Sequence, residues 1–150
     1  MAITGTVYWD TSLVLKLYAM ETGSREARKD ARGADRLVVS VLAQGEIPSA
    51  FHRKVREGQW TGAEVKAALK QVDRDVADGL LVFAPLTSDV WQRVRSVYEQ
   101  APGTLFLRAP DAIHLATATE GGFTTIYSND RHLLAAAPRF KLAGVNPIKP

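Results

Sequence analysis

The chain contains no cysteine among its 150 residues. Disulfide bonds and thiolate metal sites are therefore excluded, and a reducing compartment suits the protein. No segment approaches the roughly eighteen consecutive apolar residues that a membrane-spanning helix needs, and the first residues lack the basic and apolar regions of a secretory signal. We expect a soluble protein of the cytoplasm that has no membrane contact.

Several familiar catalytic signatures are also absent. The sequence has no G-x-S-x-G turn for a nucleophilic serine, no P-loop and no G-x-G-x-x-G turn for a dinucleotide. An enzymatic activity would therefore have to come from another arrangement of side chains.

The size and composition fit one compact domain. With 150 residues, of which 46% are hydrophobic, the chain can build one core but is too short for two ordinary domains. We therefore expect a single domain over residues 1–150. A net charge of +3 and a pI near 9.3 favour polyanionic partners, although many ordinary enzymes are equally basic.

Short β-branched and aromatic runs alternate with helical patterns along the chain. The runs predict buried strands at residues 6–9, 37–41, 80–84 and 124–127. One amphipathic helix follows Thr61 and is marked by Val65, Ala68, Leu69, Val72 and Val76. Another runs from Ser88 to about Gln100, with a core-facing side formed by Val90, Trp91, Val94, Val97 and Tyr98. This alternation predicts a parallel sheet covered on both faces, with its functional residues at the carboxyl ends of the strands.

Four acidic residues lie beside or within apolar segments, where side chains of a solvated surface are not expected. Asp10 follows the first predicted strand and Asp130 follows the fourth, while Asp111 opens the apolar helix APDAIHLATA. Glu46 lies between Gly45 and Ile47 in an apolar segment. The alternative is that each aspartate merely caps a helix, which is worth about 1 kcal/mol. Glu46 does not fit that alternative, because a carboxylate in apolar surroundings is costly unless it is paired or bound to a metal.

Four carboxylates gathered in one place would repel one another unless a cation neutralised them. An all-oxygen cluster without cysteine selects a hard ion, so Mg²⁺ or Mn²⁺ is the expected cofactor. Such an ion activates water and offsets the charge that develops on a phosphate ester, and two ions would clamp the attacking and leaving oxygens. No protein nucleophile would then be needed, in agreement with the missing signatures.

The same segments resemble a known family, the PIN-domain nucleases, and within it the VapC toxins of bacterial toxin–antitoxin pairs. The resemblance covers nearly the whole chain and is carried, in order, by VYWDTSLVLKLY, SVLAQGEIPSAFHR, DAIHLATA, YSNDRHLLAAA and AGVNP. It implies an α/β fold, namely a three-layer α/β/α domain with a central, mostly parallel sheet of about five strands. It also implies a metal-dependent endoribonuclease, a cognate antitoxin partner and a homodimer.

The resemblance assigns roles by position. It implies that Asp10, Glu46, Asp111 and Asp130 are the catalytic and metal-binding acids, with Asp10 and Asp111 as the foremost direct ligands. Further residues near these acids are candidates for contacts to the substrate or to the acids, namely Ser12, Asn129, Ser128, His114, Arg53 and Arg131. Each has an ordinary structural alternative: a hydroxyl at a helix start or strand end, a semi-buried histidine, or a solvated basic face.

Pro48, two residues after Glu46, departs from the regular helix that the resemblance implies. A proline inside a helix removes the bond to the carbonyl four residues earlier, here Gln44. We therefore predict either a kink between Gln44 and Pro48 or a helix that begins later, and either would reorient Glu46.

The leading hypothesis from the sequence is a Mg²⁺- or Mn²⁺-dependent endoribonuclease that acts as a growth-inhibiting toxin. Two alternatives keep the same fold: a housekeeping RNA-processing nuclease, and a binding module for RNA or protein whose acidic pocket is inert. The sequence leaves open the RNA target, the antitoxin, the number of metal ions and the oligomeric state.

Overall fold

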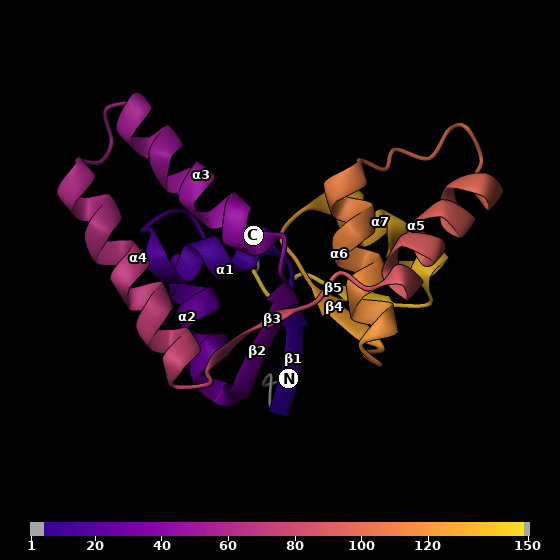
Figure 1. The fold of residues 1–150 in the computed structure, drawn as a ribbon, viewed down its shortest axis with the longest axis horizontal. Helices are drawn as coiled ribbons and strands as arrows, with labels where there is room; N and C mark the ends of the chain where they lie inside the picture. The colour runs from indigo at the N-terminus through magenta and orange to yellow at the C-terminus, as the bar shows by residue number, and fades with distance from the viewer. Residues whose placement is uncertain (1–4, 149–150) are drawn as a thin grey trace.

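A computed structural model describes residues 5–148, and it shows a central parallel sheet with helices on both faces (Figure 1). The strands are β1 (Gly5–Trp9), β2 (Ala34–Ser40), β3 (Leu81–Ala84), β4 (Thr125–Tyr127) and β5 (Ala143–Val145). They lie in the order β3-β2-β1-β4-β5, and every neighbouring pair is parallel. The expected α/β class, with a parallel sheet of about five strands, is confirmed.

Helices α1 to α4 cover one face of the sheet, and α5 to α7 cover the other (Figure 1). Their bounds are α1 (Thr11–Tyr18), α2 (Ser24–Gly33), α3 (Ala43–Arg56), α4 (Gly62–Ala77), α5 (Ser88–Gln100), α6 (Ala109–Glu120) and α7 (Arg131–Ala136), and a 3₁₀ turn follows at Ala137–Phe140.

Alternating side chains of the inner strands supply both cores. Val7 and Trp9 of β1 pack with α1 and α3, whereas Tyr8 between them packs with α6 on the other face. Because side chains of a strand point alternately to opposite faces, a strand covered on both sides must be apolar throughout. The uninterrupted run TVYW therefore marks a central strand.

Two elements lack a clear sequence signal. Helix α2 has the polar sequence SREARKDARG and buries only Ser24 and Ala27, so it carries no apolar stripe for a pattern to detect. Strand β5 is three exposed residues, Ala-Gly-Val, at the edge of the sheet. Both are held by their neighbours in the fold rather than by local preference.

The expected core-facing side of α5 is wrong at two positions. The helix buries Val90 and Val97, which are seven residues apart and share one face, while Trp91 is 48% exposed and Tyr98 is 42% exposed. Each of these aromatic residues follows a buried valine and is therefore rotated about 100° away from the core. The apolar stripe of α5 is narrower than its composition indicates.

Helix α3 begins at Ala43 and continues through Pro48, so the prediction of a helix that starts later is wrong. The backbone N–H of Glu46 already donates to the carbonyl of Leu42, 3.2 Å away, two residues before the proline. Glu46 therefore lies in the first turn of an established helix.

The strand order places a topological switch point beside β1. From β1 the chain builds β2 and β3 outwards on one side, and then returns to build β4 and β5 on the other. In open α/β sheets, ligands bind in the crevice that opens at the carboxyl ends of the two strands where the order reverses. In this fold that crevice lies beyond β1 and β4.

No helix within residues 5–148 combines the length and the apolar character needed to cross a membrane.

Candidate active site

The four acidic residues singled out in the sequence lie at the beginnings of four different helices. Asp10 and Asp130 are the N-cap residues of α1 and α7, whereas Glu46 and Asp111 lie in the first turns of α3 and α6. A helix that follows a strand of a parallel sheet, or that leads back to the start of the next strand, has its N-terminus at the carboxyl edge of the sheet. The partial positive charge of each helix N-terminus stabilises a carboxylate, typically by 0.3–1 kcal/mol.

All four acids line one hollow of about 510 Å³, whose rim carries Arg53, Arg56 and Arg108. The structure therefore brings together residues that are up to 120 positions apart in the chain. The cap alternative is correct for Asp10 and Asp130, but these side chains cap their helices and line the hollow at once. It is wrong for Asp111, because α6 begins at Ala109 and its N-cap is Arg108.

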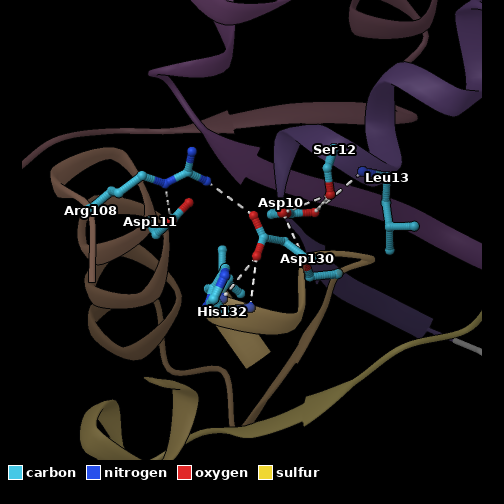
Figure 2. Close-up of polar contacts among 9 residues, drawn as sticks. Asp10, Ser12, Leu13, Arg108, Asp111, Asp130 and His132 are labelled. Carbon is cyan, nitrogen blue, oxygen red and sulfur yellow. Dashed lines mark hydrogen bonds and ion pairs between the residues drawn. The ribbon is translucent and has the colours of Figure 1, made fainter. Parts of the chain in front are cut away.

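Asp10 is the most enclosed of the four acids, with 4% of its surface exposed. Ser12 donates a hydrogen bond to its carboxylate at 2.8 Å, and the backbone N–H of Leu13 donates at 3.3 Å (Figure 2). Ser128, which follows β4, also donates to it at 2.8 Å. Burial raises the pKa of the Asp10 carboxyl above its ordinary value, although these hydrogen bonds and nearby His114 partly oppose the shift. Within residues 5–148, Asp10 is thus a buried carboxyl group that no lysine or arginine pairs with.

Glu46 belongs to a second polar group, which also contains Thr11 and His114. The Thr11 hydroxyl donates to Glu46 Oε1 at 2.7 Å, and His114 Nε2 lies 2.7 Å from the same oxygen. Within the described residues His114 Nδ1 is buried without a hydrogen-bond partner, so Nε2 is the nitrogen placed to donate. Burial raises the pKa of Glu46, but its bonds with His114 and Thr11 outweigh burial and lower it. Glu46 is therefore ionised and firmly oriented, despite Pro48.

Asp111 and Asp130 are joined by Arg108 (Figure 2). Arg108 Nε donates to Asp111 Oδ2 at 3.1 Å, and Arg108 Nη2 donates to Asp130 Oδ2 at 3.1 Å. Burial raises the pKa of Asp111 above its ordinary value and the negative charge of Asp130 adds to the shift, while Arg108 opposes it. The other oxygen of Asp130 accepts the N–H groups of His132 and Leu133 as the cap of α7.

Two residues of the site escaped the sequence analysis as individual candidates, Thr11 and Arg108. Thr11 stands inside the DTS triplet after β1, where a buried hydroxyl next to Asp10 was a usable signal. Arg108 gave only a weak local signal, its ordinary i,i+3 spacing from Asp111. Its contact with Asp130 spans 22 residues and depends on how α6 and α7 approach each other.

A second hollow of about 650 Å³ adjoins the first and shares Ser12, Arg53 and Asp130 with it. Its lining also includes Lys16, Lys54, Asn129 and Arg131, so four of the additional sequence candidates face it, namely Ser12, Arg53, Asn129 and Arg131. Lys16 and Lys54 are paired with Glu21, and Arg53 with Glu57. Asn129 accepts a bond from Asn146 at 3.2 Å. The two hollows form a basic surface around an acidic centre.

The donor set of the first hollow suits a hard divalent ion, because carboxylate and hydroxyl oxygens are the ligands that Mg²⁺ and Mn²⁺ prefer. Among the described residues no lysine or arginine contacts the buried carboxyl group of Asp10, and a bound cation would offset the cost of burying its charge. In this conformation, however, no three histidine, aspartate or glutamate side chains of residues 5–148 lie within reach of one ion. Side chains must therefore shift before an ion is held by more than two of the acids.

The doubly wound sheet and the acids at the carboxyl ends of its central strands place this chain among the α/β proteins whose functional site lies at the topological switch point. The family model for the PIN domain matches residues 7–138, and the chain belongs to that family.

Among characterised proteins, the chain is similar to ribonuclease VapC45 and ribonuclease VapC49, from two strains of Mycobacterium tuberculosis. It is 32% identical to each over 120 residues, which cover 77% of this chain and 76% of theirs.

Solved structures share the fold. A toxin–antitoxin complex from Klebsiella pneumoniae matches with a TM-score of 0.61 and 18% identity, over 96% of this chain and 99% of that one. FitAcB from Neisseria gonorrhoeae matches with a TM-score of 0.68 and 15% identity, over 94% of this chain and 97% of that one.

Proposed function

We propose that this protein is an endoribonuclease of the VapC type that hydrolyses RNA phosphodiester bonds with the help of Mg²⁺ or Mn²⁺. The observation that carries the proposal is the hollow in which Asp10, Glu46, Asp111 and Asp130 meet. The acids come from four separate segments, and the parallel sheet alone brings them together. The similarity to two VapC ribonucleases supports RNA as the substrate.

The proposed roles follow from the surroundings of each acid. Asp10 and Asp111 are the principal metal ligands, with Glu46 and Asp130 as further ligands, directly or through water. Ser12 and Ser128 hold the Asp10 carboxylate in place, while Thr11 and His114 hold Glu46. When bound, a divalent ion supplies an activated water and offsets the charge on the phosphoryl oxygens. No side chain has to act as a nucleophile.

The basic residues around the hollow bind the RNA backbone in this proposal. The acidic centre repels phosphate, and arginines at its rim compensate by offering paired N–H donors to phosphate oxygens. Arg53 is the most favourably placed, because it borders both hollows and its side chain is 67% exposed. The adjoining hollow provides a path for neighbouring nucleotides of a single strand.

The biological role proposed is that of a cytoplasmic toxin with a cognate antitoxin, acting as a homodimer that inhibits growth by cutting RNA. The toxin–antitoxin complex from Klebsiella pneumoniae shares this fold, and the VapC relatives share the sequence, which supports this role. Expression in a bacterial host should arrest growth, and co-expression of a small neighbouring protein should relieve the arrest. Normal growth of cells that contain active nuclease would indicate RNA processing instead.

The nuclease activity is tested by cleavage mapping of cellular RNA with Mg²⁺ and then with chelator. Asp111→Asn should abolish cleavage while the protein remains folded, because the amide keeps the shape of the side chain but loses the charge that a hard ion requires. Asp89→Asn is the matched control, since Asp89 is an exposed acid in the first turn of α5. Cleavage that persists in folded Asp111→Asn would defeat the proposal, and cleavage lost equally in both variants would indicate a general effect of charge.

A further inference from the structure

Arg108 occupies the oxygens that a metal ion would be expected to use. Its guanidinium lies between Asp111 and Asp130 and donates to the Oδ2 atom of each, at 3.1 Å in both cases (Figure 2). These two carboxylates therefore already share a cation, and that cation belongs to the protein itself.

The position of Arg108 allows this guanidinium to leave. Its side chain is 58% exposed, and the bonds to the two aspartates are its ion pairs within residues 5–148. As the N-cap residue of α6, Arg108 contributes no side-chain capping bond, so its movement would not disturb the start of the helix. Exposed ion pairs of this kind are individually weak.

A divalent ion bound to the Oδ2 atoms of Asp111 and Asp130 would lie next to the guanidinium of Arg108, and the two cations would repel each other. Without either cation, the two aspartates repel each other, because Asp130 disfavours the charged form of Asp111. The arginine thus keeps the two acids close together in the metal-free protein. With Arg108 in this position, no three ligating side chains of residues 5–148 are arranged to hold one ion.

We propose that Arg108 is a resident counter-ion of the active site, which a divalent metal ion must displace from Asp111 and Asp130 in order to bind. Arg108 is therefore a positioning residue that sets the metal affinity. Its guanidinium keeps the metal-free site neutralised and weakens metal binding by competition. This inference rests on the proposed metal-dependent function.

The test is a calorimetric titration of the purified full chain with Mn²⁺. Arg108→Ala should bind Mn²⁺ about three- to tenfold more tightly than the wild type, because no ion pairs have to be broken. Arg108→Gln should behave in the same way, whereas Arg108→Lys should stay close to the wild type because it keeps a competing charge. The control is Arg131→Ala, which removes an equal charge from an exposed neighbour of Asp130 and should raise the affinity by at most about twofold, because only a screened long-range repulsion of the ion is lost.

A second measurement follows Arg108 directly. The Nε–H signal of Arg108, assigned by its absence from Arg108→Lys, should shift during a titration with Mg²⁺ and reach its end point when the site is saturated. Circular dichroism and melting curves in chelator establish that each variant is folded, and Arg108→Gln serves if Arg108→Ala does not fold.

The outcomes separate the inference from the proposed function. If the wild type binds Mn²⁺ and both charge-removing variants bind no more tightly than Arg131→Ala, Arg108 does not compete with the metal and the inference is wrong. Weaker binding in those variants would likewise overturn it, since Arg108 would then support the bound ion. If neither the wild type nor any Arg108 variant binds Mn²⁺, the metal-dependent function itself fails, and the inference fails with it.

Discussion

Ser128 Oγ lies 2.8 Å from Asp10 Oδ2, although the two residues are 118 positions apart in the chain. Ser128 Oγ also accepts a hydrogen bond from the backbone N–H of Asp130 at 2.9 Å. This one hydroxyl therefore connects the acid after β1 with the acid after β4, across the switch point of the sheet. The backbone N–H of Asp10 adds a second link, because it donates to the carbonyl of Tyr127 at 3.1 Å.

Ser128→Ala should lower the free energy of unfolding by about 1–3 kcal/mol, because it removes one hydrogen bond from the buried Asp10 carboxylate and leaves the backbone N–H of Asp130 without its partner. Ser12→Ala should cost less, since Ser12 is partly exposed and water can replace its hydroxyl. Urea unfolding of the two variants in chelator provides the comparison. Equal losses would mean that the link across the sheet has no special role.

Asp10→Asn should stabilise the metal-free protein near pH 7 and abolish cleavage. Burial raises the pKa of Asp10, so the folded protein carries an unfavourable charge that asparagine removes while it still caps α1. Cleavage should fall by about a hundredfold or more, because the charge needed for metal binding is lost. Melting curves in chelator and a fluorescent RNA assay test the two effects, and a lower melting temperature would contradict the first.

The stability of the metal-free protein should fall as the pH rises from about 4 through the raised pKa values of Asp10 and Asp111. Asp10 and Asp111 have raised pKa values, so between the ordinary value of 3.8 and their raised values the folded state binds more protons than the unfolded state. Glu46 acts in the opposite direction: its lowered pKa contributes stability above its ordinary value of 4.5, and that stability is lost in acid as the pH falls through the lowered pKa.

The measurement for this pH dependence is urea unfolding in chelator at several pH values. Asp10→Asn should flatten the decline, whereas Asp89→Asn should leave it unchanged because Asp89 is exposed. A decline of the same steepness in Asp10→Asn would mean that another group titrates.

Pro48→Ala should raise the free energy of unfolding by about 1 kcal/mol, because the new N–H can bond to the carbonyl of Gln44 inside α3. RNA cleavage should change by less than about twofold, since Thr11 and His114 already hold Glu46 in the hollow. Chemical unfolding and steady-state cleavage are the measurements. A large loss of activity would instead show that the local shape of α3 at Pro48 orients Glu46.

Arg53→Ala and Arg131→Ala should weaken RNA binding and reduce its dependence on salt concentration. Each phosphate contact that is lost should lower the slope of log K against log[salt] by about 0.7 for single strands. Binding is measured in the Asp111→Asn background with chelator, so that no RNA is cut. Arg95→Ala is the control, because Arg95 is exposed on α5 and pairs with Glu99. An unchanged salt slope in both test variants would exclude these arginines from the RNA path.

Much of the fold could be predicted from local patterns in the sequence. The run TVYW marks a central strand because it is apolar on both faces, and the Thr61 to Glu64 capping box marks the start of α4. The placement of Asp10 directly after β1, and of Asp130 three residues after the end of β4, was enough to locate them at the carboxyl edge. Trp91 and Tyr98 were wrongly predicted to face the core, because the apolar residues of a helix do not by themselves show how much of its surface is buried.

The sequence by itself determined the α/β class, the alternation of strands and helices, and the acids at the ends of those elements, because periodicity and capping depend on near neighbours along the chain. Only the tertiary structure decided which distant side chains meet: Ser128 with Asp10, His114 with Glu46, and Arg108 with Asp130. Such pairs depend on the order of the strands and on the approach of whole helices. Those are set by the packing of both cores together and leave no local pattern in the sequence.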